Sequence, residues 1–316
     1  MGEYIVKRLL SALPVLFGIT VIVFLIMAMI PGDPATAILG SYATPENVER
    51  LNRQLGLDRP LPLRYLIWLG NMLQGDFGQS FSLNRPVLEE VLERLNATLI
   101  LAGSAFVLCS VLGIVAGVIS ATRQYGLADK GITFAVILGI SIPSFFLGMM
   151  MILVFAVNLR MFPVSGMWPI YGDRDLEALI RHLTLPALTL SVVATGVIAR
   201  LSRSAMLEVL RADYIRTARA KGLSERGVIL VHGLRNAILP VIAMIGLDIG
   251  IFMSGAVVVE SVYGWPGIGQ LAWLAIQRID IPIIMGVTLV AAVAIVLGNL
   301  LADITAPLID PRIRLR

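Results

Sequence analysis

The sequence has few of the residues on which disulfide frameworks and soluble folds depend. Cysteine occurs once in 316 residues, at Cys109, so the chain can form no internal disulfide. Because Cys109 lies in an apolar stretch, we expect a small packing residue there rather than a redox or metal ligand. Charged residues make up 15% of the chain and aromatic residues 7%, whereas about 25% of an ordinary soluble domain is charged. Water alone is therefore not the expected solvent.

The sequence also lacks the motifs that would mark a catalytic, nucleotide or nucleic-acid site. It has no H-E-x-x-H pair for zinc, and the glycines of the stretch YGWPGIG at 263–269 do not follow the order of a P-loop. The net charge is +4 and the isoelectric point is near 9.5. The basic residues are not interleaved with aromatic residues, so they do not indicate a nucleic-acid surface.

What the chain has in abundance is aliphatic residues, since 57% of it is hydrophobic. A helix that crosses a bilayer needs about 20 largely apolar residues. We therefore predict an all-α integral membrane protein with six transmembrane helices, at residues 9–30, 97–121, 132–159, 183–199, 238–259 and 281–302. Prolines in several of these segments are expected to kink the helices without ending them, because neighbouring helices can satisfy the freed backbone groups.

The first segment has an alternative interpretation as a cleaved signal peptide. Lys7 and Arg8 precede an apolar run that ends near Ala35-Thr36-Ala37, which resembles a cleavage site. The run is longer than the roughly 7–15 residues usual for such a peptide, and Pro31 and Pro34 crowd the cleavage site. We expect a retained helix.

The distribution of basic residues predicts the orientation in the membrane. One set of alternate loops holds fifteen Lys and Arg residues, and the other set holds four if the long first loop is left out. Positive residues resist translocation, so both termini are predicted to face the cytoplasm. His182 and His232 then lie on opposite sides of the membrane and cannot form a metal pair.

The long loop at 31–96 is consequently external, and its pattern predicts structure rather than a flexible linker. Thr44 and Pro45 read as the cap and first residue of a helix. A second amphipathic pattern surrounds Trp68 and suits a helix lying among lipid headgroups. A third starts near Pro86 and leads into the second transmembrane segment.

The cytoplasmic loop at 200–237 is both the most basic segment and a patterned one. Apolar residues from Leu201 to Tyr214 continue at helical spacing, and Val228 to Leu234 resume an apolar stripe. Between them, Gly222 can end a helix in the left-handed conformation and Ser224 can cap the next helix. The pattern predicts helix, turn, helix.

This loop resembles the EAA loop of the permeases of ABC importers, whose general pattern is E-A-A-x3-G-x9-I-x-L-P. Ala218, Gly222 and Leu234 match that pattern. The departures from it are Arg216, Thr217, His232 and Arg235. The form DYIRTARAKGL followed by HGLRNAILP looks like the variant of the dipeptide, oligopeptide and nickel permeases. The segments PGDPA, GDFGQSF, RHLTLPALTL, VVVESVYGWPGIGQL and DPRIR agree with the same family.

The resemblance implies a single permease domain spanning 1–316 in the bacterial cytoplasmic (inner) membrane, most similar to the first of two homologous permease subunits. The implied partners are a second permease subunit, two ATPase subunits or domains, an external substrate-binding protein and the lipid bilayer. The chain is then not an enzyme and holds no cofactor, because ATP and Mg²⁺ bind to the ATPase partners. Peptides are the implied cargo; nickel, glutathione and other small solutes remain open.

The resemblance also implies which residues couple ATP hydrolysis to transport. In the family, a short helix of this loop sits in a groove of the ATPase, and its cations and apolar residues make the contact. The coupling residues carried over to this chain are Arg211, Asp213, Tyr214, Ile215, Arg216, Thr217, Ala218, Arg219, Ala220, Lys221, Gly222 and Leu223. Tyr214, Ile215 and Leu223 are the expected apolar anchors.

Two carboxylates need separate interpretation. Asp248 is the one full charge inside a predicted transmembrane helix, so it is a candidate for the translocation pathway, with structural pairing to the partner permease as the alternative. Glu260 lies near the end of the same helix, where hydration at the interface explains it.

Two other classes of membrane protein compete with a permease. An intramembrane protease would need a nucleophile and base, or a zinc motif, within the membrane, and the sequence has neither. An ion-coupled secondary transporter would use intramembrane carboxylates, for which Asp248 is the sole candidate.

Overall fold

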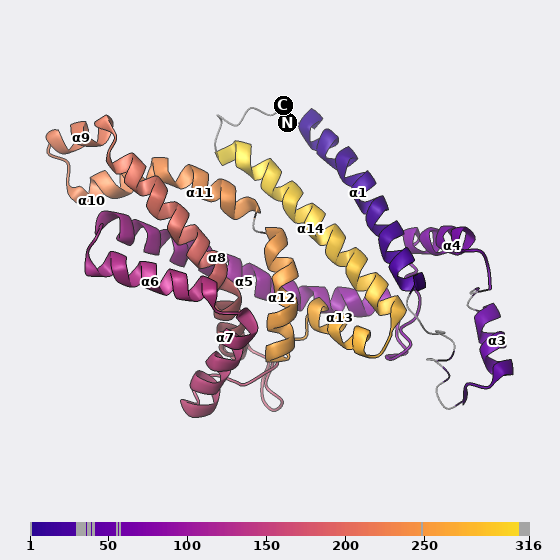
Figure 1. The fold of residues 1–316 in the computed structure, drawn as a ribbon. Helices are drawn as coiled ribbons and strands as arrows, with labels where there is room; N and C mark the ends of the chain where they lie inside the picture. Colours follow the sequence, from indigo (N-terminus) through magenta and orange to yellow (C-terminus); the bar gives the residue numbers. More distant parts are fainter. Residues whose placement is uncertain are drawn as a thin grey trace.

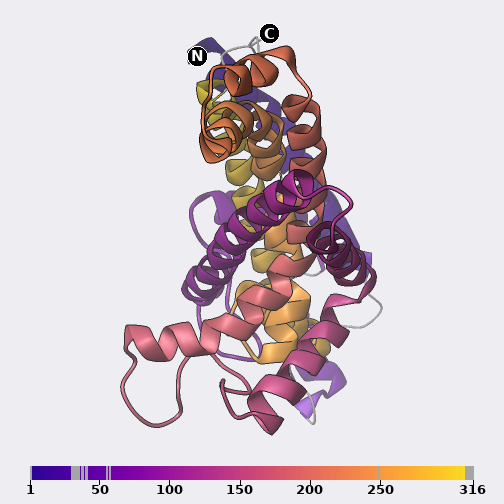
Figure 2. The same ribbon diagram turned by 90° about the vertical axis from the view of Figure 1, so that its left-hand side faces the viewer.

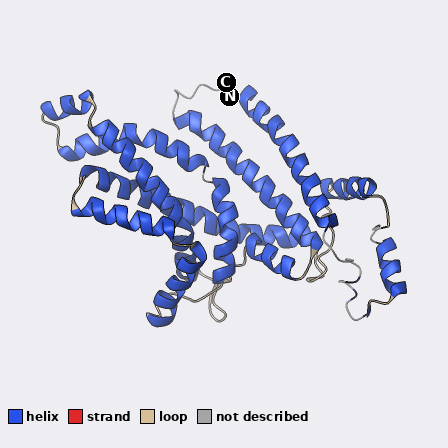
Figure 3. Cartoon of the chain, in the orientation of Figure 1, coloured by secondary structure: helices blue, strands red, loops and turns tan. Residues whose placement is uncertain are grey.

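The computed structural model describes residues 2–29, 42–54, 58–247 and 249–309, together with residues 36, 39 and 56. No β-strand occurs within these ranges, where the one bridge joins Gln79 to Pro86. Figure 3 shows helices throughout the described chain. The predicted all-α class is therefore confirmed for this part of the protein.

Four helices and a bent pair form the body of the protein. The long helices are α1 (Gly2–Met29), α5 (Val87–Thr122), α8 (Leu176–Leu210) and α14 (Ile281–Ile309). The bent pair is α6 (Leu127–Ser141) with α7 (Ser144–Met151), which continues as the π-helix η2 (Ile152–Asn158). The remaining helices are α3 (Pro45–Gln54), α4 (Leu61–Leu73), α9 (Asp213–Ala220), α10 (Glu225–Gly227), the π-helix η3 (Val228–Leu234), α11 (Arg235–Leu247), α12 (Ile249–Tyr263) and α13 (Ile268–Gln277).

Four of these helices are individually long and apolar enough to cross a bilayer, and the bent pair would make a fifth. The third predicted transmembrane helix, 132–159, is thus not one continuous helix. Its two halves meet at 109°, because Pro143 disfavours helical geometry at the residue before it and Ile142 is extended (φ −83°, ψ 126°). Pro14, Pro186 and Pro240, by contrast, remain inside helices as predicted.

The start of α1, the end of α14 and the helices of the 200–237 region lie on the same side of the molecule. The start of α1, the end of α14 and helix α9 lie toward the top of Figures 1 and 2, whereas α3, α7 and α13 lie toward the bottom. Helices α11 and α12 run in different directions in Figure 1.

Close approach of α5 and α8 organises the centre of the fold, and theirs is the most extensive contact between two elements. Helices that pack in lipid gain little from hydrophobic burial, so small residues that let backbones approach are favoured. Gly117 of α5 meets this requirement, since a Cβ added there would lie 2.7 Å from the carbonyl oxygen of Ala199 and would overlap Ser202. Contact between the two backbones therefore depends on glycine at position 117.

The described part of the loop predicted to be external is held against the helices by contacts that the sequence only partly indicated. The Thr44 Oγ1 accepts the backbone N–H of Asn47 (3.3 Å), so the predicted cap at the start of α3 is confirmed. Helix α4 packs Tyr65 and Trp68 against Phe24 of α1, with ring centroids 5.3 and 5.7 Å away. The third predicted helix and the second transmembrane segment are one 36-residue helix, α5.

A buried carboxylate at the start of α14 holds the end of this loop. Asp280 accepts hydrogen bonds on Oδ2 from the Ser80 hydroxyl (2.6 Å), the Ser82 hydroxyl (2.8 Å) and the Ser82 backbone N–H (2.9 Å). Burial alone would raise the pKa of the Asp280 carboxyl, but the hydrogen bonds from Ser80 and Ser82 hold it below its ordinary value. This contact could not be expected from the sequence, because some two hundred positions separate its partners.

Glu260 lies in the interior, so the prediction that hydration at the interface explains it is wrong. The residue is 0% exposed. Its Oε1 accepts from the Thr98 hydroxyl of α5 (2.6 Å), and its Oε2 accepts from the Gln270 backbone N–H of α13 (3.0 Å). A buried carboxylate is tolerated when its oxygens are hydrogen-bonded in this way. The YGWPGIG stretch thus packs around Glu260 instead of binding a phosphate.

Replacing Gly267 by alanine is expected to destabilise the protein, because a Cβ at this position would overlap the Glu260 carboxylate. Overpacking of this kind costs typically about 1–3 kcal/mol, measurable as a lower thermal midpoint in detergent. Gly103→Ala is the matched control, since nothing lies within 4 Å of its added Cβ. Equal thermal midpoints for the two variants would contradict this expectation, because the residues around Glu260 would then accommodate the added methyl group without loss of stability.

Candidate functional site

The segment predicted to be cytoplasmic begins with a helix that is longer than predicted. Helix α8 starts at Leu176, where Asp175 Oδ1 accepts the Ala178 backbone N–H (2.8 Å), and it runs without a break to Leu210. The predicted helix at 183–199 was therefore too short at both ends. The first part of the predicted loop at 200–237 is the continuation of α8 beyond the apolar region.

Helix α8 ends before Asp213, so the chain has a break ahead of the one at Gly222 that the sequence predicted. Ala212 is extended (φ −69°, ψ 149°) and starts the separate eight-residue helix α9 at Asp213. An aspartate in the first turn is favoured by the helix dipole, whereas the apolar periodicity across the break carries no signal of it. Tyr214 thus belongs to a short helix of its own.

The predicted turn after this helix is confirmed in both of its details. Gly222 has φ +78°, the left-handed conformation that glycine adopts without the Cβ penalty. Its N–H donates to the Arg219 carbonyl (2.9 Å). The Ser224 hydroxyl then accepts the Gly227 backbone N–H (3.3 Å) and caps α10, after which the chain continues through η3 into α11.

An apolar base fixes α9 to the rest of the chain. Ile215 is 0% exposed, Ala218 is 6% exposed, and both pack with Val228 of η3 and with Val209 of α8. The prediction that Ile215 anchors a partner protein is therefore wrong, because the side chain is used within the chain itself. Helix α9 is thus held in a fixed position, and together with its buried base of Ile215, Ala218, Val228 and Val209 it forms the α9 platform.

The other predicted coupling residues lie on the outer surface of this platform. Tyr214 and Leu223 are each 45% exposed and remain candidates for apolar anchors. The exposed polar and small residues of the predicted set are Arg211, Asp213, Arg216, Thr217, Arg219, Ala220, Lys221 and Gly222. Figure 1 shows α9 and α10 at the edge of the molecule, beyond the ends of α6 and α8.

Some of the charged side chains on the platform form ion pairs with one another. Arg219 Nη2 donates to Glu225 Oε1 (2.7 Å), across the Gly222 turn, and its Nε donates to Oε2 (3.2 Å). The hydrogen bond from Arg219 lowers the pKa of the Glu225 carboxyl. Arg216 lies 3.5 Å from Asp213. Within the described residues, Arg211 and Lys221 make no such pair and keep their charge available to a partner.

The second predicted site, Asp248, lies outside the described residues. Helix α11 ends at Leu247 and α12 begins at Ile249 on either side of it. The pathway role of Asp248 stays a prediction. Among the described residues no cluster of His, Cys, Asp or Glu could hold a metal ion.

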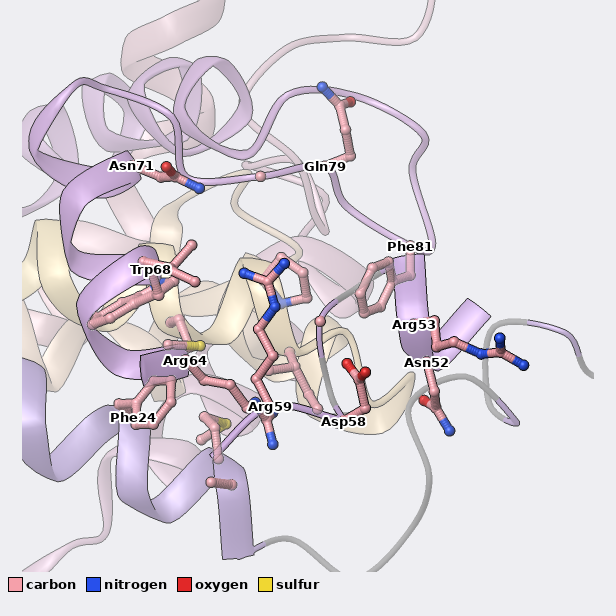
Figure 4. A pocket seen from close by; sticks show the side chains of 18 of the residues that line it. Phe24, Asn52, Arg53, Asp58, Arg59, Arg64, Trp68, Asn71, Gln79 and Phe81 are labelled. Carbon is pink, nitrogen blue, oxygen red and sulfur yellow. The ribbon is translucent and has the colours of Figure 1, made fainter. Parts of the chain in front are cut away.

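The structure contains a cavity of about 1340 Å³ beside α4 that the sequence did not reveal. It lies between α3, α4, the 76–81 loop and the adjoining ends of α1 and α14. Figure 4 shows Arg59 and Arg64 beside Asp58, Phe81 and Trp68 in its wall. The Arg and Asp residues around the end of α3 were the only sequence signal, and their spacing follows no known motif.

Comparison with known proteins decides the family. Residues 113–315 match the family described as "Binding-protein-dependent transport system inner membrane component", and residues 1–102 match the N-terminal membrane component of the same kind of system. The chain belongs to this family. The resemblance noted from the sequence is confirmed: the protein is a permease subunit of an ABC importer in the inner membrane, with several apolar helices crossing it.

Curated relatives match over nearly the whole chain. The oligopeptide transport system permease AppB of Bacillus subtilis is 44% identical over 314 residues, covering 99% of each protein. The di/tripeptide permease DppB of Pseudomonas aeruginosa and the glutathione permease GsiC of Escherichia coli K12 are each 40% identical, again with 99% of both chains covered.

A solved structure has a fold similar to that of this chain. An inward-facing form of the MetNI methionine ABC transporter contains a chain with a TM-score of 0.54 at 16% identity. The match covers 69% of this permease and 95% of that chain. At this identity the likeness concerns the fold alone.

The burial of Ile215 leads to a test of the α9 platform. Ile215→Ala is expected to loosen α9 selectively, since truncating a buried isoleucine typically costs about 2–5 kcal/mol. Hydrogen exchange of the amides at 213–220 should then speed up, while exchange in α5 stays unchanged. Leu223→Ala, at an exposed position, is the control. Equal protection in the two variants would mean that the apolar base does not hold α9.

Proposed function

We propose that this permease forms half of the translocation pathway of an ATP-driven peptide importer. In this proposal α9 contacts the ATPase and is displaced when the ATPase closes. The observation that carries the proposal is the build of α9. It is a short helix with a buried apolar base and an exposed face bearing Tyr214, Arg216 and Lys221. A groove on an ATPase subunit with carboxylates at its rim would fit this face.

In this arrangement the protein has six transmembrane segments with both termini in the cytoplasm. The first four are α1, α5, the bent pair of α6 with α7 and η2, and α8. Helices α11 and α12 together form the fifth, and α14 forms the sixth. The position of α9 at the same end of the molecule as the start of α1 supports this topology (Figures 1 and 2).

The partners follow from the same reasoning. A second homologous permease subunit completes the pathway, two ATPase subunits or domains bind ATP and Mg²⁺, and an external binding protein delivers the substrate. The chain contributes no catalytic residue and no cofactor. Asp248 is the candidate for contact with the substrate in the pathway.

Di- and oligopeptides are the proposed cargo. The names of the relatives in Bacillus subtilis and Pseudomonas aeruginosa support it. Glutathione, nickel or another small solute is the alternative, and the glutathione permease of Escherichia coli supports the first of these. Thermal-shift measurement of the external binding protein with dipeptides, longer peptides, glutathione and nickel chelates separates these substrates.

The proposed function requires uptake that depends on ATP and on the partner subunits. The assembled complex in vesicles should accumulate labelled peptide when ATP is present and not when a proton or sodium gradient replaces ATP. Gradient-driven uptake by this chain alone would instead identify a secondary transporter.

Gly222→Val should abolish uptake while the protein still inserts into the membrane and assembles. A β-branched residue in the left-handed conformation at φ +78° is strained, so the turn that presents α9 would be lost. Gly222→Asn is the matched control, because asparagine tolerates this conformation. If the valine variant transported as well as the asparagine variant, with the ATPase still bound, α9 would not be the coupling element.

A further inference from the structure

An ion pair built on a buried carboxylate lies outside the α9 platform and joins three helices near it. Asp129 is in the first turn of α6 and is 4% exposed. Its partner Arg203 lies in α8, about two turns before α8 ends at Leu210. Ser120 of α5, which is 1% exposed, completes the cluster. The three residues are called the α5–α6–α8 clamp below.

Both carboxylate oxygens of Asp129 and the hydroxyl of Ser120 have hydrogen-bond partners in the clamp. Arg203 donates from Nε to Asp129 Oδ1 (2.9 Å) and from Nη2 to Oδ2 (2.9 Å), a bidentate arrangement. Its Nε also approaches the Ser120 hydroxyl oxygen (3.0 Å), and that hydroxyl donates to Asp129 Oδ1. The Tyr125 backbone N–H, in the turn between α5 and α6, donates to Oδ2 (2.8 Å).

Retention of a basic loop in the cytoplasm would not require this geometry. A cation that only keeps a loop in the cytoplasm can remain solvated, as the exposed Arg200 does three residues earlier. Burying the Asp129 carboxylate is costly unless it is well paired, and the half-buried Arg203 supplies that pairing. The planar guanidinium of Arg203 supplies two parallel hydrogen bonds, which a lysine could not. The clamp therefore fixes the orientation of α8 relative to α6 and α5.

The clamp lies between the α9 platform and the break at Pro143. Toward α9, helix α8 continues from Arg203 to Val209, which packs against the buried base of the platform. Beside the clamp, Gly117 and Ser202 hold α5 and α8 in close contact. In the other direction, α6 runs from Asp129 to Ser141 and meets α7 at 109°.

We propose that the α5–α6–α8 clamp is the positioning site through which displacement of α9 reaches α6 and the bend at Pro143, an inference that rests on the proposed coupling role of α9. With the bidentate pair in place, α6 must follow α8. When the pair is broken, α9 and α8 can move while α6 stays behind, so ATP is hydrolysed without a matching movement of the pathway.

The test is the number of peptides transported per ATP hydrolysed by the reconstituted complex. Arg203→Lys keeps the charge but loses the bidentate contact, and Asp129→Asn keeps the shape but loses the charge. Each is expected to lower the ratio by roughly tenfold while ATP hydrolysis continues. The exchanged pair Asp129→Arg with Arg203→Asp should recover part of the ratio. Arg200→Lys, on the same helix, should leave it unchanged.

A merely structural role predicts a different result. Less complex would then assemble, but each assembled complex would transport the normal number of peptides per ATP, and that outcome would overturn the inference. Failure of the proposed function is distinguishable, because the wild-type complex would then show no ATP-dependent uptake or Gly222→Val would transport normally. An ATP-dependent wild type with clamp variants of normal ratio would reject the clamp alone.

Discussion

The contact between α5 and α8 is the constraint on which the rest of the structure depends. A protein in lipid gains little from excluding water between helices, so its helices must approach closely enough for dispersion and polar contacts to hold them. Gly117 allows this approach against Ala199 and Ser202. The other helices pack around this pair, and α9 is carried at the end of α8. The position of the α9 platform therefore depends on the contact between α5 and α8.

Hydrogen-bonded carboxylates join helices near both ends of α5. At the end near α9, Asp129 joins α6 to α8 through Arg203. At the opposite end, Glu260 joins α12 to α5 through Thr98 and to α13 through the Gln270 backbone. Each carboxylate is costly to bury alone and is tolerated because its partners come from different helices. The same property makes them useful as fixed joints in an otherwise apolar packing.

Local features of the fold could be predicted from the sequence, and those set by distant partners could not. The Gly222 turn and the Ser224 and Thr44 caps depend on residues within a few positions, so their chemistry is visible in the sequence. The burial of Ile215 depends on Val228 across the turn, and the apolar spacing alone did not show which face is covered. Glu260 and Asp129 were missed for the same reason. Pro143 was read as a kink, although the extended Ile142 before it makes a full break.

The central claim is that α9 and α5 belong to one rigid body that moves when the ATPase closes. Pulsed electron spin resonance can measure this, because Cys109 is the single native cysteine and Cys109→Ala gives a clean background. Labels at Arg226→Cys in α10 and Thr122→Cys in α5 form one pair, and Arg226→Cys with Trp273→Cys in α13 forms the other. Arg226 is exposed, lies outside the residues proposed to contact the ATPase, and follows Glu225, which pairs with Arg219 of α9. With ATP bound, the α10–α5 distance should stay unchanged and the α10–α13 distance should shift. A shift in the α10–α5 distance would contradict the claim.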